Sequence, residues 1–278
     1  MTNFVVTALG VVAVGSAVFL GIWLRDSRVP YRPFDGEADL RAWMAEAART
    51  TSAALAGGVL AGFLVAGFGG RLLMRVVAVT SNETAQGRLT EADEVVGRVT
   101  GGGTAFLVTF VGLFSGIIGA LSMLLFRRLL PDRSWAAGLT VAGVIGGVLA
   151  RPSDLLNPDS IDFEILGPGW FAAAFGVALI AGLGIVGAEL IDTFTNHWPT
   201  PTRSFKGLTG LLPLLLLGAL GPGLLVAVPV LALRSVVRPD RFLGTHSAAA
   251  NVLAAALIVA GVVGWLWIFV AVGEIVLG

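Results

Sequence analysis

A charged segment between two apolar stretches carries the side chains best suited to binding chemistry. Arg71 and Arg75 stand four residues apart at the end of an apolar run, so on a helix they share one face. The insert that follows carries both signs of charge, at Glu91, Asp93, Glu94 and Arg98. Charged groups at membrane depth are costly and are usually paired. We therefore predict a polar outer vestibule lined by these six residues. The alternative is a solvated hairpin whose surface ion pairs contribute little.

A second polar segment is acidic. Residues 151–169, RPSDLLNPDSIDFEILGPG, contain four carboxylates, at Asp154, Asp159, Asp162 and Glu164. A hard cation needs several converging oxygen ligands, but this run lacks the regular spacing of an EF-hand. We expect an acidic loop without a metal, and no cofactor. Because this loop and the arginine-bearing segment are expected on the same side of the membrane, we predict an electrostatic contact between them.

The motifs of common enzymes are missing. The sequence contains no HExxH and no GxSxG, and no paired catalytic aspartates stand within an apolar run. It also contains no cysteine, which excludes disulfides, thiolate metal sites and cysteine nucleophiles. Its net charge of zero gives no reason to expect nucleic-acid binding. An enzymatic function is therefore not expected.

The elements that must position these charges are membrane helices. The chain of 278 residues is 56% hydrophobic and 13% charged, whereas soluble domains carry about 25% charged residues. The pattern predicts an all-α, polytopic transmembrane helical bundle that forms a single domain over residues 1–278. Seven spans are expected, at about 4–24, 53–79, 104–126, 135–151, 168–191, 208–234 and 249–273.

The sixth of these spans leaves the topology open. Residues 208–234 are interrupted by several prolines and glycines and are long for a hydrocarbon core of about 30 Å. We interpret the segment as one kinked span, which places ten basic residues on the inside and eight on the outside. A re-entrant pair is the alternative, and it changes the tally to thirteen against five. Arginines after the first span place the N-terminus on the extracytoplasmic side of the cell membrane.

Two polar segments are predicted to lie at the membrane surface. Within residues 27–50, a short helix carries Leu40, Trp43, Met44 and Ala47 on one face. Within residues 88–103, Thr90 and Asp93 resemble a capping box that starts an amphipathic helix. Three glycines, 101–103, are expected to end that helix, and Thr104 is expected to cap the next span.

Small residues recur four apart on the spans, as Gly58 and Gly62, Gly112 and Gly116, Gly143 and Gly147, and Ala256 and Ala260. Such pairs let helix backbones approach closely. They favour packing within one bundle. Contact with a second copy or with a partner in a membrane complex is the alternative, and the lipid bilayer is the expected surrounding.

The segments GRLLMRVVA, QGRLTEADEVVGRVTGGGT and NPDSIDFEILGPGW resemble a broad group of multi-spanning integral membrane proteins of high-GC Gram-positive bacteria. The resemblance implies a bacterial cell-membrane protein, and it transfers no binding or catalytic residue because the group has no established activity. The leading hypothesis is a small-solute or ion transporter, or a channel-like bundle, with a charged outer vestibule. The alternative is a non-catalytic accessory or scaffold subunit of a membrane complex.

Overall fold

The described part of the chain is helical and suited to a membrane. The computed structural model describes residues 40–89, 95–97, 100–127, 129–149, 156–160, 167–199, 207, 209–220 and 248–277. Four of its helices are long and apolar enough to cross a membrane, namely Ala45–Thr80, Gly101–Phe126, Gly169–His197 and Val252–Leu277. Ser134–Leu149 is a shorter apolar helix. The predicted helical character is confirmed for these residues, whereas the count of seven spans remains a prediction.

The first described helix is much longer than the predicted span 53–79. It joins α2 (Leu40–Ala61), η1 (Gly62–Gly69), which is a π-helix, and α3 (Gly70–Thr80). Its 36 membrane-compatible residues extend about 54 Å, beyond the ~30 Å hydrocarbon core. We predicted a separate surface helix within residues 27–50. Residues 40–50 instead form the first turns of α2. No proline or glycine interrupts the chain between Leu40 and Ser52.

The insert after α3 also differs from the prediction. Leu89 and Val95 form an antiparallel bridge, and Gly87 and Gly97 have φ angles of +82° and +83°. A chain that doubles back in this way is a turn, so an amphipathic helix through residues 88–99 is wrong for the described positions. The positive φ of Gly97 is the physical reason, since a helix requires negative φ. Residues 90–94, with the predicted cap at Thr90, lie outside the described residues.

The next span begins earlier than expected. It comprises α4 (Gly101–Phe106), the π-helix η3 (Leu107–Val111) and α5 (Gly112–Phe126). Thr100 is its N-cap, because Thr100 Oγ1 accepts a hydrogen bond of 3.1 Å from the Gly103 backbone N–H. The glycines 101–103 thus start a helix instead of ending one, and the prediction of Thr104 as the cap is wrong. A threonine that precedes free backbone N–H groups can cap a helix, so the sequence alone was compatible with a cap at either Thr100 or Thr104.

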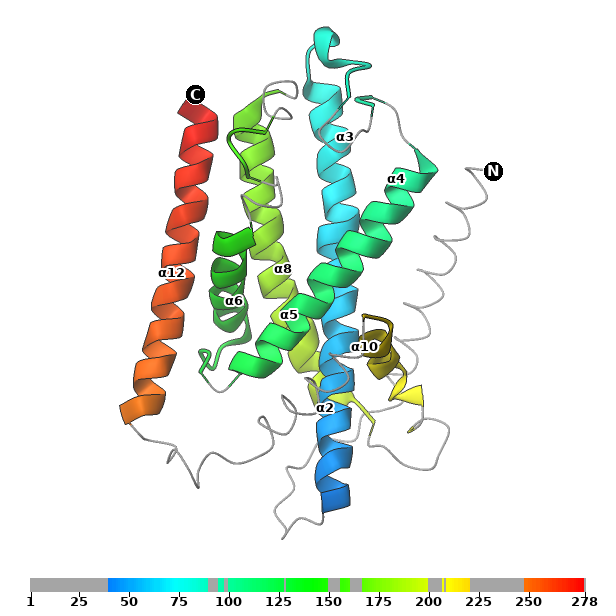
Figure 1. The fold of residues 1–278 in the computed structure, drawn as a ribbon, viewed down its shortest axis with the longest axis vertical. Coiled ribbons are helices and arrows are strands. Elements are labelled where there is room, and N and C mark those ends of the chain that lie inside the picture. The colour runs from blue at the N-terminus through cyan, green and yellow to red at the C-terminus, as the bar shows by residue number, and fades with distance from the viewer. Residues whose placement is uncertain are drawn as a thin grey trace.

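The remaining described helices complete the bundle in Figure 1. They are α6 (Ser134–Leu149), α8 (Gly169–His197), η4 (Leu212–Leu214), α10 (Leu215–Leu220) and α12 (Ala248–Leu277), while η2 (Glu83–Ala85) is a short turn beyond α3. In this view α5 crosses in front of α2 and α8, and α12 stands at the edge, beside α6. The packing order is therefore α12, α6, α8, α2 and α5.

Glycines make the helix contacts. Carbonyl oxygens of α5 would meet a Cβ atom added to Gly58 of α2 or to Gly62 of η1, and Gly138 of α6 faces Gly184 of α8 in the same way. Gly143 and Gly147 of α6 pack in a similar way against Gly261 and Gly264 of α12, respectively. Three of the four predicted small-residue pairs thus pack within this chain, whereas Ala256 and Ala260 are exposed.

These contacts set the direction of the helices. Gly143 lies by Gly261 and Gly147 by Gly264, so α6 and α12 run parallel. Contacts of Gly138 with Gly184 and of Gly146 with Ile180 make α6 and α8 antiparallel. The end of α8 and the start of α12 therefore lie at the same end of the bundle, as Figure 1 shows. A connection between them must cross the membrane an even number of times, which disagrees with our interpretation of 208–234 as one kinked span.

Candidate functional site

The two arginines of the predicted vestibule lie on α3 in different environments. Arg75 is exposed, whereas Arg71 is partly buried. The Nε and Nη2 atoms of Arg71 are buried and have no hydrogen-bond partner among the described residues. Buried polar atoms are usually satisfied, so this side chain is unusual. The other four predicted vestibule residues, Glu91, Asp93, Glu94 and Arg98, lie outside the described residues.

The two polar segments on this side do meet. Ser81, just after α3, and Gly167, just before α8, are joined by a hydrogen bond of 3.2 Å from the Gly167 N–H to Ser81 Oγ. Thr80 Oγ1 donates to the carbonyl oxygen of Gly167 over 3.3 Å. The described contact is therefore made by neutral groups. Of the four carboxylates of the predicted acidic loop only Asp159 is described, and its backbone N–H donates to Asn157 Oδ1 over 3.2 Å. Asp154, Asp162 and Glu164 lie outside the described residues.

A buried arginine at the other end of the bundle was not singled out from the sequence. The Arg49 side chain is 1% exposed and forms a two-pronged contact with Glu46, from Nη2 to Oε1 at 2.9 Å and from Nε to Oε2 at 3.0 Å. Its Nη1 donates to the carbonyl oxygens of Thr195 and Trp198 at 2.8 and 3.2 Å. This arginine therefore ties α2 to the end of α8. The available signal was an acid–base pair three apart directly before an apolar run.

The same cluster holds the segment after α8. Trp198 Nε1 and Ser52 Oγ both donate to the carbonyl oxygen of Gly210, the indole over 2.9 Å. Ser52 is fully buried. The described hydrogen bonds of Arg49, Ser52 and Trp198 are directed at backbone carbonyl oxygens or at Glu46, so the cluster joins α2 to the end of α8 and to the segment that follows it.

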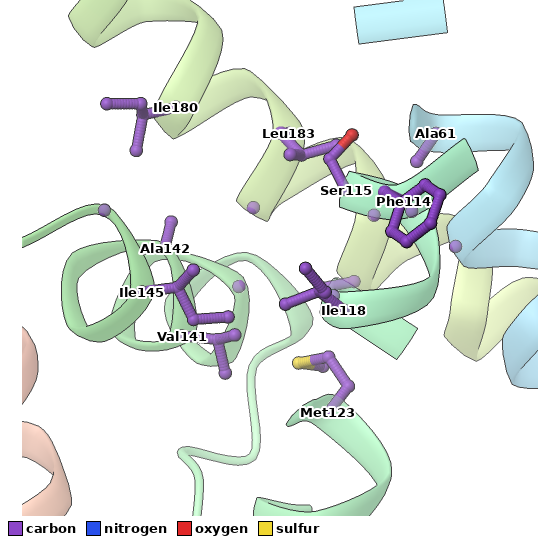
Figure 2. A pocket seen from close by; sticks show the side chains of 18 of the residues that line it. Ala61, Phe114, Ser115, Ile118, Met123, Val141, Ala142, Ile145, Ile180 and Leu183 are labelled. Atoms are coloured by element: carbon purple, nitrogen blue, oxygen red, sulfur yellow. The ribbon is translucent and has the colours of Figure 1, made fainter. Parts of the chain in front are cut away.

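An apolar groove lies between α5, α6 and α8, with α2 as its floor. Its volume is about 390 Å³, within the range of small-molecule pockets. Figure 2 shows Ile118 of α5 facing Val141 and Ile145 of α6 across the space, with Ile180 and Leu183 of α8 above them in this view. Along α8 the lining extends from Ile180 to Ile191, about 16 Å at the helical rise.

The groove offers almost no free polar group. Among the described residues that line it, Ser115 has the only polar side chain, and its hydroxyl donates to the Val111 carbonyl oxygen of its own helix over 2.5 Å. Phe114 and Ile118 are 37% and 41% exposed, so the groove is open along α5. A Cβ atom at Gly119 would meet nothing within 4 Å, which marks empty space beside that residue. The lining therefore suits hydrocarbon.

The groove exists because its walls are held apart by the packing on either side of it. Gly58 and Gly116 draw α5 against α2, while Gly138 and Gly184 draw α6 against α8. Direct contact between α5 and α6 is sparse, and α5 crosses the bundle obliquely in Figure 1. Two close helix pairs splayed from each other leave a wedge that the small lining residues do not fill.

A cluster of three polar side chains lies at one end of the groove. Arg127 Nη2 lies 3.0 Å from Asp192 Oδ1 and 3.3 Å from Oδ2. Ser134 Oγ donates to Asp192 Oδ2 over 2.6 Å. The Arg127 and Asp192 side chains are 43% and 24% exposed, so the group is partly solvated. We call these three residues the Arg127 cluster.

No protein-family model, curated protein or solved structure matches this chain. Its function is therefore inferred from the groove and the charged groups. Sequence reasoning placed its candidate site at the α3 end of the bundle. It missed the groove because a groove is formed by the spacing between helices, which apolar composition does not reveal.

Proposed function

We propose that this integral membrane protein binds the hydrocarbon part of an amphiphile in the groove between α5, α6 and α8. The observation that supports the proposal is the combination of an open volume with a lining whose only polar side chain is already hydrogen-bonded. An alkyl chain in this space would exchange contact with lipid or water for contact with packed apolar side chains. The predicted transporter function would then concern a lipid-like molecule.

An ion is a poor ligand for the groove. Ion pathways present rings of carbonyl oxygens or charged side chains, which replace the water of hydration. None of the described residues that line the groove is charged, so an ion would lose its hydration without compensation. An amphiphile avoids this cost because its polar part can stay at the membrane surface.

The experiment uses a phosphatidylcholine that carries a diazirine in one acyl chain, added to the purified full-length protein in maltoside micelles. Illumination and peptide mapping are expected to place the cross-links on groove residues such as Ile118 and Ile145, above the level at exposed Val259 and Leu266 of α12. Gly119→Phe fills the empty space and is expected to remove the groove cross-links. Gly273→Phe is the matched control, since its site is also open but lies outside the groove.

Equal labelling of the groove and of α12, or groove labelling that survives Gly119→Phe in a folded protein, would contradict the proposal. Circular dichroism of both variants checks folding. Both replace a helical glycine, so neither loses intrinsic helix stability.

The hypothesis of a small-solute or ion transporter with a charged outer vestibule remains the second candidate. It is favoured by Arg71, whose buried Nε and Nη2 atoms have no partner among the described residues and are available to an anion. The test is alanine replacement of Arg71 and Arg75 with flux measured in proteoliposomes. Unchanged ion or solute flux would remove the vestibule from consideration.

A role as an accessory or scaffold subunit requires exposed small residues for contact with a partner, and most of the predicted small-residue pairs are not exposed. Gly58, Gly112 and Gly143 and their partners are occupied inside the chain, whereas Ala256 and Ala260 on α12 face outward. A second copy or a membrane partner would therefore be sought on α12. Cross-linking between single cysteines placed at these two alanines tests this alternative.

A further inference from the structure

We infer that the Arg127 cluster binds the phosphate of a phospholipid whose acyl chain lies in the groove. This inference rests on the proposed binding of an amphiphile, and it adds the headgroup chemistry. It follows from the position of the cluster, from the donors left on Arg127 and from the charges around it.

The position follows from three helices that each pass from the groove to the cluster. On α5, Met123 lines the groove and Arg127 comes one turn later. On α8, Ile191 lines the groove and Asp192 is the next residue. On α6, Ser134 comes one turn before the lining residue Gly138. A molecule with its chain in the groove would therefore carry its polar end to the cluster.

The guanidinium of Arg127 has donors to spare. Both of its described hydrogen bonds to Asp192 come from Nη2, so Nε and Nη1 have no partner among the described residues. Asp192, which itself accepts a hydrogen bond from Ser134, occupies Nη2, the nitrogen shared by both two-pronged edges of the guanidinium. The Nε and Nη1 atoms can therefore each donate one charge-assisted hydrogen bond to a phosphate oxygen.

The charged residues around the cluster favour recognition of a phosphate group over general attraction to anionic lipids. The connection from α5 to α6 contains Arg127, Arg128 and Arg133 against the single acid Asp132, and Arg133 and Asp132 are exposed. On α8, exposed Glu189 adds a negative charge three residues before Asp192. Since these six charged residues comprise three of each sign, recognition is expected to depend on the phosphate itself and not on the net charge of the lipid.

The test compares two probes without net charge that have identical diazirine acyl chains, zwitterionic phosphatidylcholine and uncharged diacylglycerol, on the full-length protein in maltoside micelles. Only the first contains a phosphate. Groove cross-links are expected to be about three- to fivefold stronger with phosphatidylcholine, the ratio expected for a partly exposed charged contact. Arg127→Gln is expected to lower phosphatidylcholine labelling to the diacylglycerol level. Arg88→Gln, an exposed arginine at the other end of the bundle, is the control and is expected to leave the ratio unchanged.

Asp192→Asn separates lipid binding from a structural ion pair. If the arginine binds phosphate, removal of the competing carboxylate strengthens phosphatidylcholine labelling, whereas a purely structural pair would lose labelling with both probes. Equal labelling by the two probes, or a ratio unaffected by Arg127→Gln, overturns the inference and leaves the amphiphile proposal intact. Failure of both probes to label the groove, or cross-links through Ile118 between two protein copies, overturns both.

Discussion

Gly58 of α2 and Gly116 of α5 leave no room for a side chain between them. A Cβ atom added to Gly58 would lie 2.5 Å from the carbonyl oxygen of Gly116. Lipid tails supply no hydrophobic drive for helix association, so close backbone packing must hold such pairs together. The same contact seats α5 on α2 and thereby sets one wall of the groove.

Replacement of Gly58 with leucine is expected to separate α5 from α2. Overpacking of this kind costs about 1–3 kcal/mol, so the midpoint of thermal unfolding in detergent should fall. Gly273→Leu is the matched control because nothing lies within 4 Å of its Cβ position. Equal midpoints for the two variants would show that the backbones are not in contact at Gly58.

Arg49→Ala is expected to lower stability by about 3 kcal/mol, because it leaves Glu46 without its charge partner and two carbonyl oxygens without a donor. The measurement is thermal unfolding followed by circular dichroism. Exposed Arg88 provides the comparison, since Arg88→Ala should change stability by no more than about 0.5 kcal/mol. A similar small effect at Arg49 would contradict its role in joining α2 to α8.

Arg71→Leu is expected to raise the stability of the protein, whereas Arg49→Ala is expected to lower it. Because the Nε and Nη2 atoms of Arg71 are buried without a described partner, their removal should raise stability by about 1 kcal/mol. The measurement is the same thermal unfolding assay, with Arg75→Leu as the exposed counterpart on the same helix. A large loss of stability would mean that Arg71 has a partner that the described residues do not include.

Single cysteines at Phe205 and Asp240 are expected to react from the same side of the membrane, because α8 ends and α12 begins at one end of the bundle. The chain has no native cysteine, so labelling by an impermeant maleimide is free of background. With both sites inside, thirteen of the eighteen basic residues fall on the cytoplasmic side, as the positive-inside rule favours. Labelling from opposite sides would restore the single kinked span.

Much of the architecture was predictable from the sequence. Low charge and long apolar runs identified the membrane helices, because a backbone in lipid must satisfy its own hydrogen bonds. The spacing of Gly58 with Gly62, Gly112 with Gly116 and Gly143 with Gly147 correctly indicated close packing within the chain. Local signals were less reliable at the ends of elements. Thr100 and Thr104 are equally good caps in isolation, and the structure uses Thr100.

The tertiary structure decided the features on which function depends. Hydropathy cannot tell whether helices run parallel or antiparallel, so the shared end of α8 and α12 emerged only from the contacts of α6 with both. The groove depends on the angle at which α5 crosses its neighbours. Arg127 and Asp192 lie 65 residues apart in sequence, and only the folded bundle brings them within hydrogen-bond distance. The composition and the hydrophobic period of a sequence report on one helix at a time, whereas a binding site depends on the distances between helices.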